Sequence, residues 1–321
     1  MRTLRISPFE HIRAAQAFAA RLLTPDRIQT TKANEELLRI HVDELTGANR
    51  PRAFFRNPEN IRDLNDSADY IISVFQRLGL DVEIDEFRVP GLDSIFRNIR
   101  VSFGPKEGER FIIGAHYDVY KSTPGADDNA SGVAGLLELA RLMVENKINP
   151  KTPVDLIAYT LEENPYSLLG SRVHATQLKK AGVKVKGMIS LEMIGYFSDE
   201  PESQSLPLKL MKLIYPTMGN FILVGGYGNS FSLAQKVSTL MKNHGGIPSH
   251  KLWIPYSSLL PDIKRSDHAS FSDLGYPAVI VTDTSFNRNP NYHKDTDGPE
   301  TLSFPKMAKV VDGIFGLIKS L

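Results

Sequence analysis

Two adjacent carboxylates, Asp127 and Asp128, stand directly before an apolar-periodic run in the segment 124–143. Val133, Leu136 and Met143 recur there at the spacing of one helix face, which indicates a loop leading into a helix. One carboxylate can cap the exposed amides of the first helical turn, but the other then needs a different partner. From this segment alone, a capped helix and a bound metal ion both remain open.

Other acidic and imidazole side chains stand directly after short apolar runs. They are His116 and Asp118 after 111–115, Glu162 and Glu163 after 154–161, Glu192 after 188–191, and His293 in the loop that follows 278–282. Each one alone has an ordinary structural explanation, such as a core histidine or a solvated edge. In an open α/β sheet, however, functional sites form outside the carboxyl ends of the strands, and several like charges there are costly unless cations neutralise them.

These side chains are numerous enough to hold two zinc-like ions, because catalytic zinc takes about three protein ligands and keeps a position for water. The predicted ligands are His116, Asp127, Glu163, Glu192 and His293. Asp127 is the predicted bridge between the two ions. The chain contains no cysteine, so any metal site must use histidine, aspartate and glutamate.

Two further residues are predicted to take part in catalysis without being metal ligands. Asp118, two residues beyond His116, is placed to accept the other N–H of that imidazole and to fix its tautomer. Glu162 is adjacent to a predicted ligand but is not needed as one, so it is the predicted general base.

The elements that must position these residues alternate between strand and helix. Apolar runs that predict strands buried on both faces lie at 111–115, 154–159, 188–191, 221–224 and 278–281. Helical periodicity lies at 60–80, 129–146, 166–181, 230–244 and 267–274, and from 305 to the C-terminus. Two alternating segments, 82–87 and 99–103, predict a pair of antiparallel strands. The fold expected is α/β with three layers, in which a mixed, mainly parallel sheet carries helices on both faces.

No linker, repeat or low-complexity tract divides the 321 residues, so we expect one domain, in which residues 1–45 form a helical N-terminal extension packed on the rest. The formal net charge of +1 gives no field that would attract nucleic acid or a membrane surface. The N-terminus lacks the apolar core of a signal peptide, and no later run is long enough to span a membrane, so we expect a cytoplasmic protein. The oligomeric state stays open.

From about Glu44 to the C-terminus, the sequence resembles the co-catalytic zinc aminopeptidase family, which includes bacterial leucine aminopeptidases, glutamate carboxypeptidase and the glutaminyl cyclases. Six motifs in family order carry the resemblance. They are Gly-Ala-His116-Tyr-Asp118, Pro-Gly-Ala-Asp127-Asp128-Asn-Ala-Ser-Gly, Leu-Glu162-Glu163, Ser-Leu-Glu192-Met-Ile-Gly, Ser266-Asp267-His268-Ala-Ser-Phe271 and Tyr292-His293-Lys-Asp-Thr-Asp297.

The resemblance implies that His116 and Glu192 hold one metal ion, that Glu163 and His293 hold the other, and that Asp127 bridges them. It also implies Glu162 as the base and a cis peptide bond between Asp127 and Asp128. Two departures from the family pattern bear on substrate and metal. Glu192 replaces the shorter aspartate of many relatives, and a longer loop over 164–171 replaces a short glycine-containing link.

The reaction expected is hydrolysis of the first peptide bond of a peptide, in which Glu162 deprotonates a metal-bound water and later gives the proton to the departing amine. Tyr256 is a candidate donor to the oxyanion. The aromatic residues Tyr196, Phe197, Phe286 and Tyr292 either line an apolar side-chain pocket or pack in the core.

Two other functions remain open from the sequence. One is glutaminyl cyclisation with a single zinc ion, and the other is a metal-free binding module on the same fold. The retained ligands favour two ions and a peptide substrate. The preferred side chain of the substrate and the identity of the metals do not follow from the sequence.

Overall fold

The computed structural model describes residues 31–321, apart from the side chain of Lys209, and the stretch from Lys32 to Leu321 forms one compact unit. Residues 1–30 lie outside the described residues, so that part of the predicted helical N-terminal extension stays a prediction. The later part of the extension contains α2 (Glu35–Thr46).

Helix α2 begins and ends at residues suited to helix caps. The side chain of Asn34 accepts hydrogen bonds from two backbone amides of the first turn, and Gly47 ends the helix with a φ of 69°. Leu38 and Val42 are fully buried, so α2 contributes one face to the core.

The sheet is mixed and mainly parallel, as predicted. Its strands are β1 (Glu83–Arg88), β2 (Ile95–Phe103), β3 (Arg110–His116), β4 (Val154–Tyr159), β5 (Val185–Leu191), β6 (Ile222–Tyr227), β7 (Ser249–Ile254) and β8 (Ala278–Thr282). In space they follow the order β1-β2-β4-β3-β5-β8-β6-β7. Strands β4, β3, β5 and β8 run parallel at the centre, whereas β2 is antiparallel to β4, and β6 is antiparallel to β8. The predicted antiparallel pair at 82–87 and 99–103 is β1 with β2.

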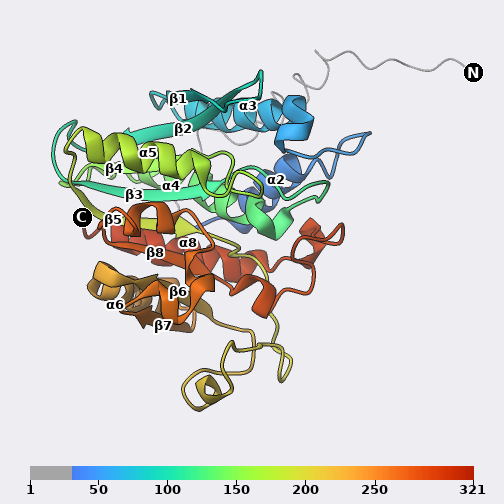
Figure 1. The fold of residues 1–321 in the computed structure, drawn as a ribbon, viewed down its shortest axis with the longest axis vertical. Coiled ribbons are helices and arrows are strands. Elements are labelled where there is room, and N and C mark those ends of the chain that lie inside the picture. Colours follow the sequence, from blue (N-terminus) through green and yellow to red (C-terminus); the bar gives the residue numbers. More distant parts are fainter. Residues whose placement is uncertain (1–30) are drawn as a thin grey trace, which may run out of the picture. The chain divides into compact units, whose positions relative to one another are not determined.

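Helices cover both faces of this sheet. They are α3 (Ile61–Arg77), α4 (Gly132–Glu145), α5 (Leu169–Lys180), α6 (Phe231–Leu240), α7 (His268–Ser272) and α8 (Phe304–Ile318), together with α2. Alternate strand residues separate into two apolar clusters: Ile113 packs with α4 and α8 on one face, and Ile112 packs with α5 and α7 on the other. In Figure 1, α5 lies in front of β3 and β4. The predicted three-layer architecture is therefore confirmed.

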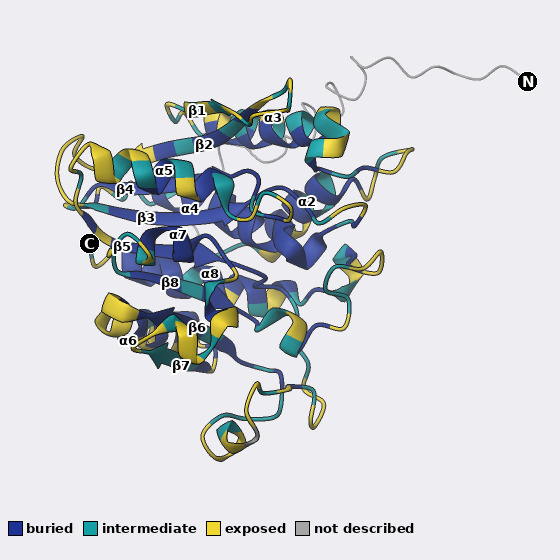
Figure 2. Ribbon diagram, viewed as in Figure 1, coloured by how far each residue is buried: buried dark blue, intermediate teal, exposed yellow. Residues whose placement is uncertain are grey.

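The centre of the sheet is the most deeply buried part, as the dark strands of Figure 2 show. Helix α4 lies against it and is buried along most of its length, which explains why its sequence is mainly apolar. Its buried charges, Glu138 and Arg141, pair with each other at 2.6 Å. Strand β7 at the sheet edge was not predicted, because His250, Lys251 and Trp253 are only half buried and give no clear alternation. Among residues 31–321, no helix combines the length and the apolar character needed to cross a bilayer.

His41 on α2 gives the fold a defined response to acid. Its Nδ1 lies 2.7 Å from the hydroxyl of Tyr70 on α3, and burial lowers the pKa of His41 from 6.5 to about 3. Between those two values the unfolded chain binds a proton that the folded chain does not. With respect to His41, the free energy of unfolding is therefore highest above pH 6.5, and it falls as the pH drops toward 3.

We predict that acidification from pH 7 to pH 5 lowers the free energy of unfolding by about 2 kcal/mol more in the wild-type protein than in the His41→Gln variant. The reason is that glutamine at position 41 cannot take up the proton when the chain unfolds. Urea denaturation of chelated protein at several pH values measures the difference. The exposed His244→Gln is the control and should keep the wild-type slope. Equal slopes for His41→Gln and the wild type would contradict the prediction.

Candidate metal centre

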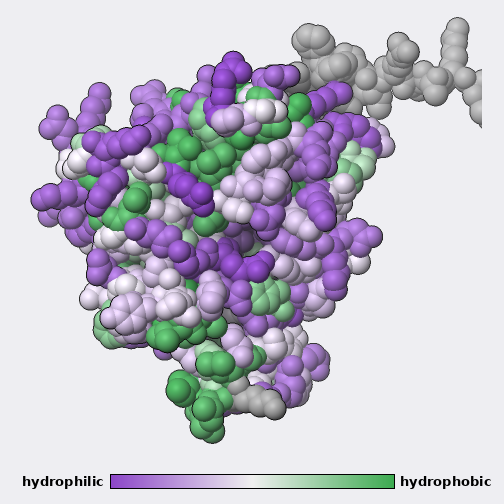
Figure 3. All heavy atoms as spheres, in the orientation of Figure 1, coloured by the Kyte–Doolittle hydropathy of each residue, from purple (hydrophilic) through white to green (hydrophobic). Residues whose placement is uncertain are grey.

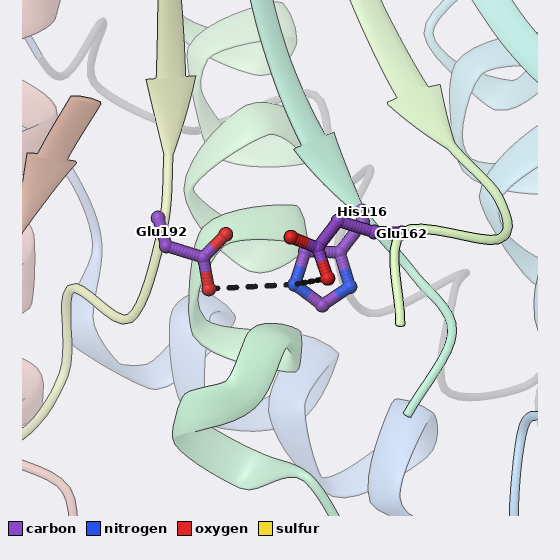
Figure 4. Close-up of side chains that lie close together, drawn as sticks. All are labelled: His116, Glu162 and Glu192. Atoms are coloured by element: carbon purple, nitrogen blue, oxygen red, sulfur yellow. Dashed lines mark hydrogen bonds and ion pairs between the residues drawn. The ribbon is translucent and has the colours of Figure 1, made fainter. Parts of the chain in front are cut away.

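Three neighbouring parallel strands deliver side chains to one point beyond their carboxyl ends. His116 ends β3, Glu192 follows β5, and Glu162 follows β4 by a short turn. Figure 4 shows the three side chains pointing toward one another. The Nε2 atom of His116 lies 3.4 Å from Oε1 of Glu192 and 3.9 Å from Oε2 of Glu162. Oxygen Oδ1 of Asp128 lies 3.3 Å from the same nitrogen.

A second group forms around His293 on the loop after β8. Its Nε2 lies 3.2 Å from Oδ2 of Asp128 and 3.3 Å from Oε1 of Glu163. The imidazole is stacked between two tyrosine rings, with centroid distances of 4.0 Å to Tyr120 and 3.8 Å to Tyr292. Asp128 thus directs one carboxylate oxygen to each imidazole, which is the arrangement of a bridging ligand.

The predicted bridge, Asp127, is corrected to Asp128. Oxygen Oδ1 of Asp127 accepts a hydrogen bond from the backbone amide of Gly195 at 2.9 Å, and Oδ2 accepts one from Asn289 at 2.7 Å. Both oxygens of Asp127 are therefore engaged with the surrounding loops, and it belongs to neither group of candidate ligands found among the described residues.

The turn that carries these aspartates explains the correction. Residues Ala126–Ser131 form an irregular helical turn in which Asp128 and Asn129 have non-helical φ and ψ, so adjacent side chains leave in different directions. The cis peptide bond also lies one position later than predicted, between Asp128 and Asn129. The carboxylate of Asp297 holds the turn by accepting the backbone amides of Asp127 at 3.0 Å and Asp128 at 3.1 Å.

Asp118 has a different role from the one predicted. Its carboxylate oxygens accept the backbone amides of Glu162 and Glu163, each at 3.1 Å. The imidazole of His116 instead lies with Nδ1 at 3.1 Å from the backbone carbonyl of Asp118, and at 3.6 Å from its carboxylate. Asp118 therefore orients the segment that carries the two glutamates, and its carbonyl accepts the imidazole N–H.

Two positioning residues were missed by the sequence analysis. Ser266 donates a 2.8 Å hydrogen bond to Oε2 of Glu192, which leaves Oε1 directed at His116. The buried guanidinium of Arg56 donates to the carbonyls of Pro124 and Gly125 at 2.7 and 2.5 Å, in the loop before Asp128. Ser266 stood within a quoted motif, but Arg56 lies outside every motif and gave no signal.

The protonation of the site indicates a place for cations. Burial alone would lower the pKa of His293, but hydrogen bonds to Asp128 and Glu163 outweigh it and raise the pKa to about 9. Burial raises the pKa of Glu163 to about 7. The pKa of Asp128 is lowered, because hydrogen bonds from His116 and His293 outweigh its burial. In this structure, protons on the imidazoles compensate the buried carboxylates.

The donors fit divalent cations. Nδ1 of His116 points to a backbone carbonyl, so Nε2 is the nitrogen that faces the carboxylate oxygens, and a cation bound between them would take the place of its proton. The two candidate groups are His116 with Glu162 and Glu192, and Asp128 with Glu163 and His293; within each, the ligand atoms lie within 4.8 Å of one another. Nitrogen and oxygen donors without thiolates suit zinc.

A cavity of about 360 Å³ opens beside these groups. Asp128, Glu162, Glu163, Glu192 and His293 all lie in its lining, which also contains other polar and charged side chains and many apolar ones. The apolar lining includes Leu206, Met211, Tyr215, Phe221, Leu223, Leu252, Leu260, Ile263, Ile280 and Phe286. The unusual loop after Glu163 also contributes, through Asn164, Ser167 and Leu168.

The aromatic residues named from the sequence have different places. Phe286 and Tyr292 line the cavity, whereas Phe197 packs against the large apolar cluster and Tyr196 is not among the lining residues. Tyr256 is 71% exposed and is also absent from the lining, so the structure does not bring this predicted oxyanion donor to the site.

The loop between β5 and β6 contributes to the cavity and also projects from the sheet. Met211 and Tyr215 on this loop line the cavity. Apolar side chains of the same loop gather on the surface in Figure 3, among them Leu210 and Leu213, with Leu213 84% exposed.

Comparisons with known proteins agree with this geometry. The family model described as Peptidase family M28 matches residues 98–318. The Escherichia coli protein YfbL, described as uncharacterized, is 40% identical over 89% of this chain and 88% of its own length. Leucine aminopeptidase 1 of Metarhizium robertsii is 28% identical over 65% of this chain, and the match spans only about half, 51%, of the fungal protein.

Solved structures share the fold at low sequence identity. BSAP, a zinc aminopeptidase from Bacillus subtilis, gives a TM-score of 0.69 at 16% identity, over 92% of this chain and 96% of that one. A glutaminyl cyclase from Bacteroides thetaiotaomicron gives 0.67 at 19% identity, over 90% and 99%. Because the family model spans more than half of the sequence and a 40% identical relative spans nearly all of it, the chain belongs to peptidase family M28.

Proposed function

We propose that the protein is a zinc-dependent aminopeptidase that removes the first residue of peptides. The observation that carries the proposal is that Asp128 lies between the two ligand groups, with Oδ1 at His116 and Oδ2 at His293. Glu162 lies beside His116 and forms no ion pair with another histidine of the described residues. Membership of a peptidase family and a relative named leucine aminopeptidase support the choice of reaction.

We assign the candidate ligands to two ions. His116, Glu192 and Asp128 would hold one, and Asp128, Glu163 and His293 would hold the other. When bound, such ions acidify a coordinated water and polarise a peptide carbonyl. Glu192 reaches its place despite being longer than aspartate, because Ser266 fixes its second oxygen.

Glu162 is the proposed general base. Burial raises the pKa of its carboxyl well above the ordinary value, while the neighbouring His116 opposes that rise. Its backbone amide is fixed by Asp118, and its side chain faces the cavity. From there Glu162 would take the proton of the attacking water and then deliver it to the departing amine.

The cavity supports an apolar first residue in the substrate. Phe221, Leu223 and Ile280 line the same cavity as the carboxylates, and apolar lining of this kind favours burial of an apolar side chain. The lining also contains the charged residues Asp262, Lys264 and Arg265.

Glutaminyl cyclisation is the second candidate, since a cyclase shares the fold. The full set of donors for two ions favours the peptidase, because the cyclase branch is expected to use a single zinc ion. A metal-free binding module would have no use for the buried, mutually oriented carboxylates.

The deciding experiment offers the zinc-loaded protein aminoacyl p-nitroanilides, dipeptides and a peptide that begins with glutamine, with products identified by mass spectrometry. We expect free N-terminal residues, most rapidly from leucine or phenylalanine, and loss of activity with chelators. Pyroglutamate without hydrolysis would establish the cyclase instead. Binding without turnover of any of these compounds would favour the binding module.

We predict that Glu162→Gln lowers kcat by about 10²- to 10⁴-fold, because the amide cannot accept a proton, while metal content stays close to that of the wild type. Steady-state kinetics and elemental analysis of the same preparations test this. Glu59→Gln, at an exposed position that is not part of the cavity lining, is the control for general effects of the substitution. Wild-type turnover by Glu162→Gln would remove Glu162 from the mechanism.

The two neighbouring aspartates give a matched test of the bridge. About two zinc ions per chain are expected for the wild type, and we predict that Asp128→Asn binds fewer. The variant should also lose the thermal stabilisation by zinc, because both proposed ions need its carboxylate. Asp127→Asn removes charge at the adjacent position without removing a ligand, so its folded fraction should still bind both ions. Zinc calorimetry and melting curves with and without zinc measure this, and an unchanged zinc stoichiometry in Asp128→Asn would refute the bridge.

A further inference from the structure

Arg265 is a basic side chain in the wall of the catalytic cavity. It lines the same space as Glu162, Glu163 and His293. It stands directly before Ser266, whose hydroxyl is bonded to Glu192, so the backbone that carries Arg265 is tied to the candidate metal centre. The backbone at Arg265 is therefore held next to a residue that contacts the candidate metal centre.

The guanidinium of Arg265 is held at the cavity by aromatic neighbours. Nη2 donates a 3.0 Å hydrogen bond to the hydroxyl of Tyr292, and the guanidinium carbon lies 5.0 Å from the centre of the Phe286 ring. Tyr292 in turn stacks on His293. These contacts restrict the side chain, although it remains 48% exposed.

The nearby acid Asp262 forms an ion pair with the guanidinium of Arg265 but no hydrogen bond. Its Oδ1 lies 3.9 Å from Nη1 of Arg265, which is beyond hydrogen-bond length. A second basic residue of the lining, Lys264, is engaged by Asp273 at 2.7 Å. Arg265 is thus the lining cation whose charge is better placed to meet a ligand, and its planar fork suits the two oxygens of a carboxylate.

We propose that Arg265 binds a carboxylate of the substrate, so that the enzyme favours short peptides carrying a carboxylate close to the bond that is cut. One source of the carboxylate is the C-terminus of a dipeptide, which is compatible with an apolar first residue. The other is the side chain of an acidic first residue, which would replace the preference for an apolar one. This inference rests on the proposed exopeptidase function and adds the class of substrate to it.

The competing explanation is structural. Arg265 could serve only to hold Tyr292, and through it the ring that stacks on His293. In that case loss of the guanidinium slows every substrate by the same factor. Recognition of a carboxylate instead slows only those substrates that carry one, so the ratio between matched substrates separates the two roles.

The experiment compares kcat/KM for two matched pairs with the zinc-loaded enzyme. One pair is Leu-Ala and Leu-Ala amide, which differ in the terminal carboxylate, and the other is the p-nitroanilides of glutamate and glutamine. In one of the two pairs, we expect kcat/KM to be about tenfold higher for the compound with the carboxylate than for its amide partner. This factor corresponds to one charge-assisted hydrogen bond. Arg265→Met should bring that ratio close to one, Arg265→Lys should restore part of it, and Lys264→Met should keep the wild-type ratio.

Calorimetry of the same four compounds with zinc-loaded Glu162→Gln measures the preference without turnover. A carboxylate preference that Arg265→Met removes in this background supports the inference, even for an enzyme whose natural reaction differs. Equal handling of acid and amide in both pairs, or an equal loss for all compounds in Arg265→Met, would overturn it. Absence of hydrolysis by the wild type with all four compounds and with leucine p-nitroanilide counts against the proposed function instead.

Discussion

Negative charge is concentrated at one rim of the sheet, and the rest of the site is arranged to hold it there. Asp128, Glu163 and Glu192 are buried within about 3.5 Å of an imidazole each, an arrangement that is costly without positive charge. Each acid is restrained through a different contact. Asp297 accepts the backbone amide of Asp128, Asp118 accepts that of Glu163, and Ser266 bonds the side chain of Glu192. These contacts all come from the protein, and together they restrain the orientation of each donor.

The turn after β4 explains how two adjacent glutamates acquire separate roles. Leu161 has a φ of 58°, in the left-handed region, and turns the chain sharply at the strand end. Both oxygens of Asp118 then fix the next two backbone amides, so the glutamate side chains are committed to different directions. Glu163 faces His293 and Glu162 faces His116. One buried carboxylate, that of Asp118, thereby positions both a candidate ligand, Glu163, and a candidate base, Glu162.

The sequence predicted the layers and the strand exits because both depend on local patterns. Continuous apolar runs such as 111–115 mark strands buried on two faces, and polar residues after them must meet at one edge. The sequence did not predict features that depend on the direction in which a side chain points. Asp127 and Asp128 are equivalent in composition, and only the irregular turn decides which one faces the histidines. Arg56 was invisible because its bonds to Pro124 and Gly125 join segments far apart in the chain. Tyr256 was chosen by residue type alone, and β7 lacks the alternation that identifies an edge strand.

The two walls of the cavity have different origins, and this separates chemistry from selectivity. The reactive wall comes from strand ends in the parallel centre of the sheet, where β4, β3 and β5 fix the spacing of their side chains. Much of the rest of the lining comes from Leu223 and Ile280 on the antiparallel strands β6 and β8, from the loop between β5 and β6, and from the segment before Ser266. Loops tolerate changes in length and sequence more readily than central strands do. Substitutions in the loop between β5 and β6, or in the segment before Ser266, can therefore alter which substrate is accepted while the carboxylates and imidazoles stay in place.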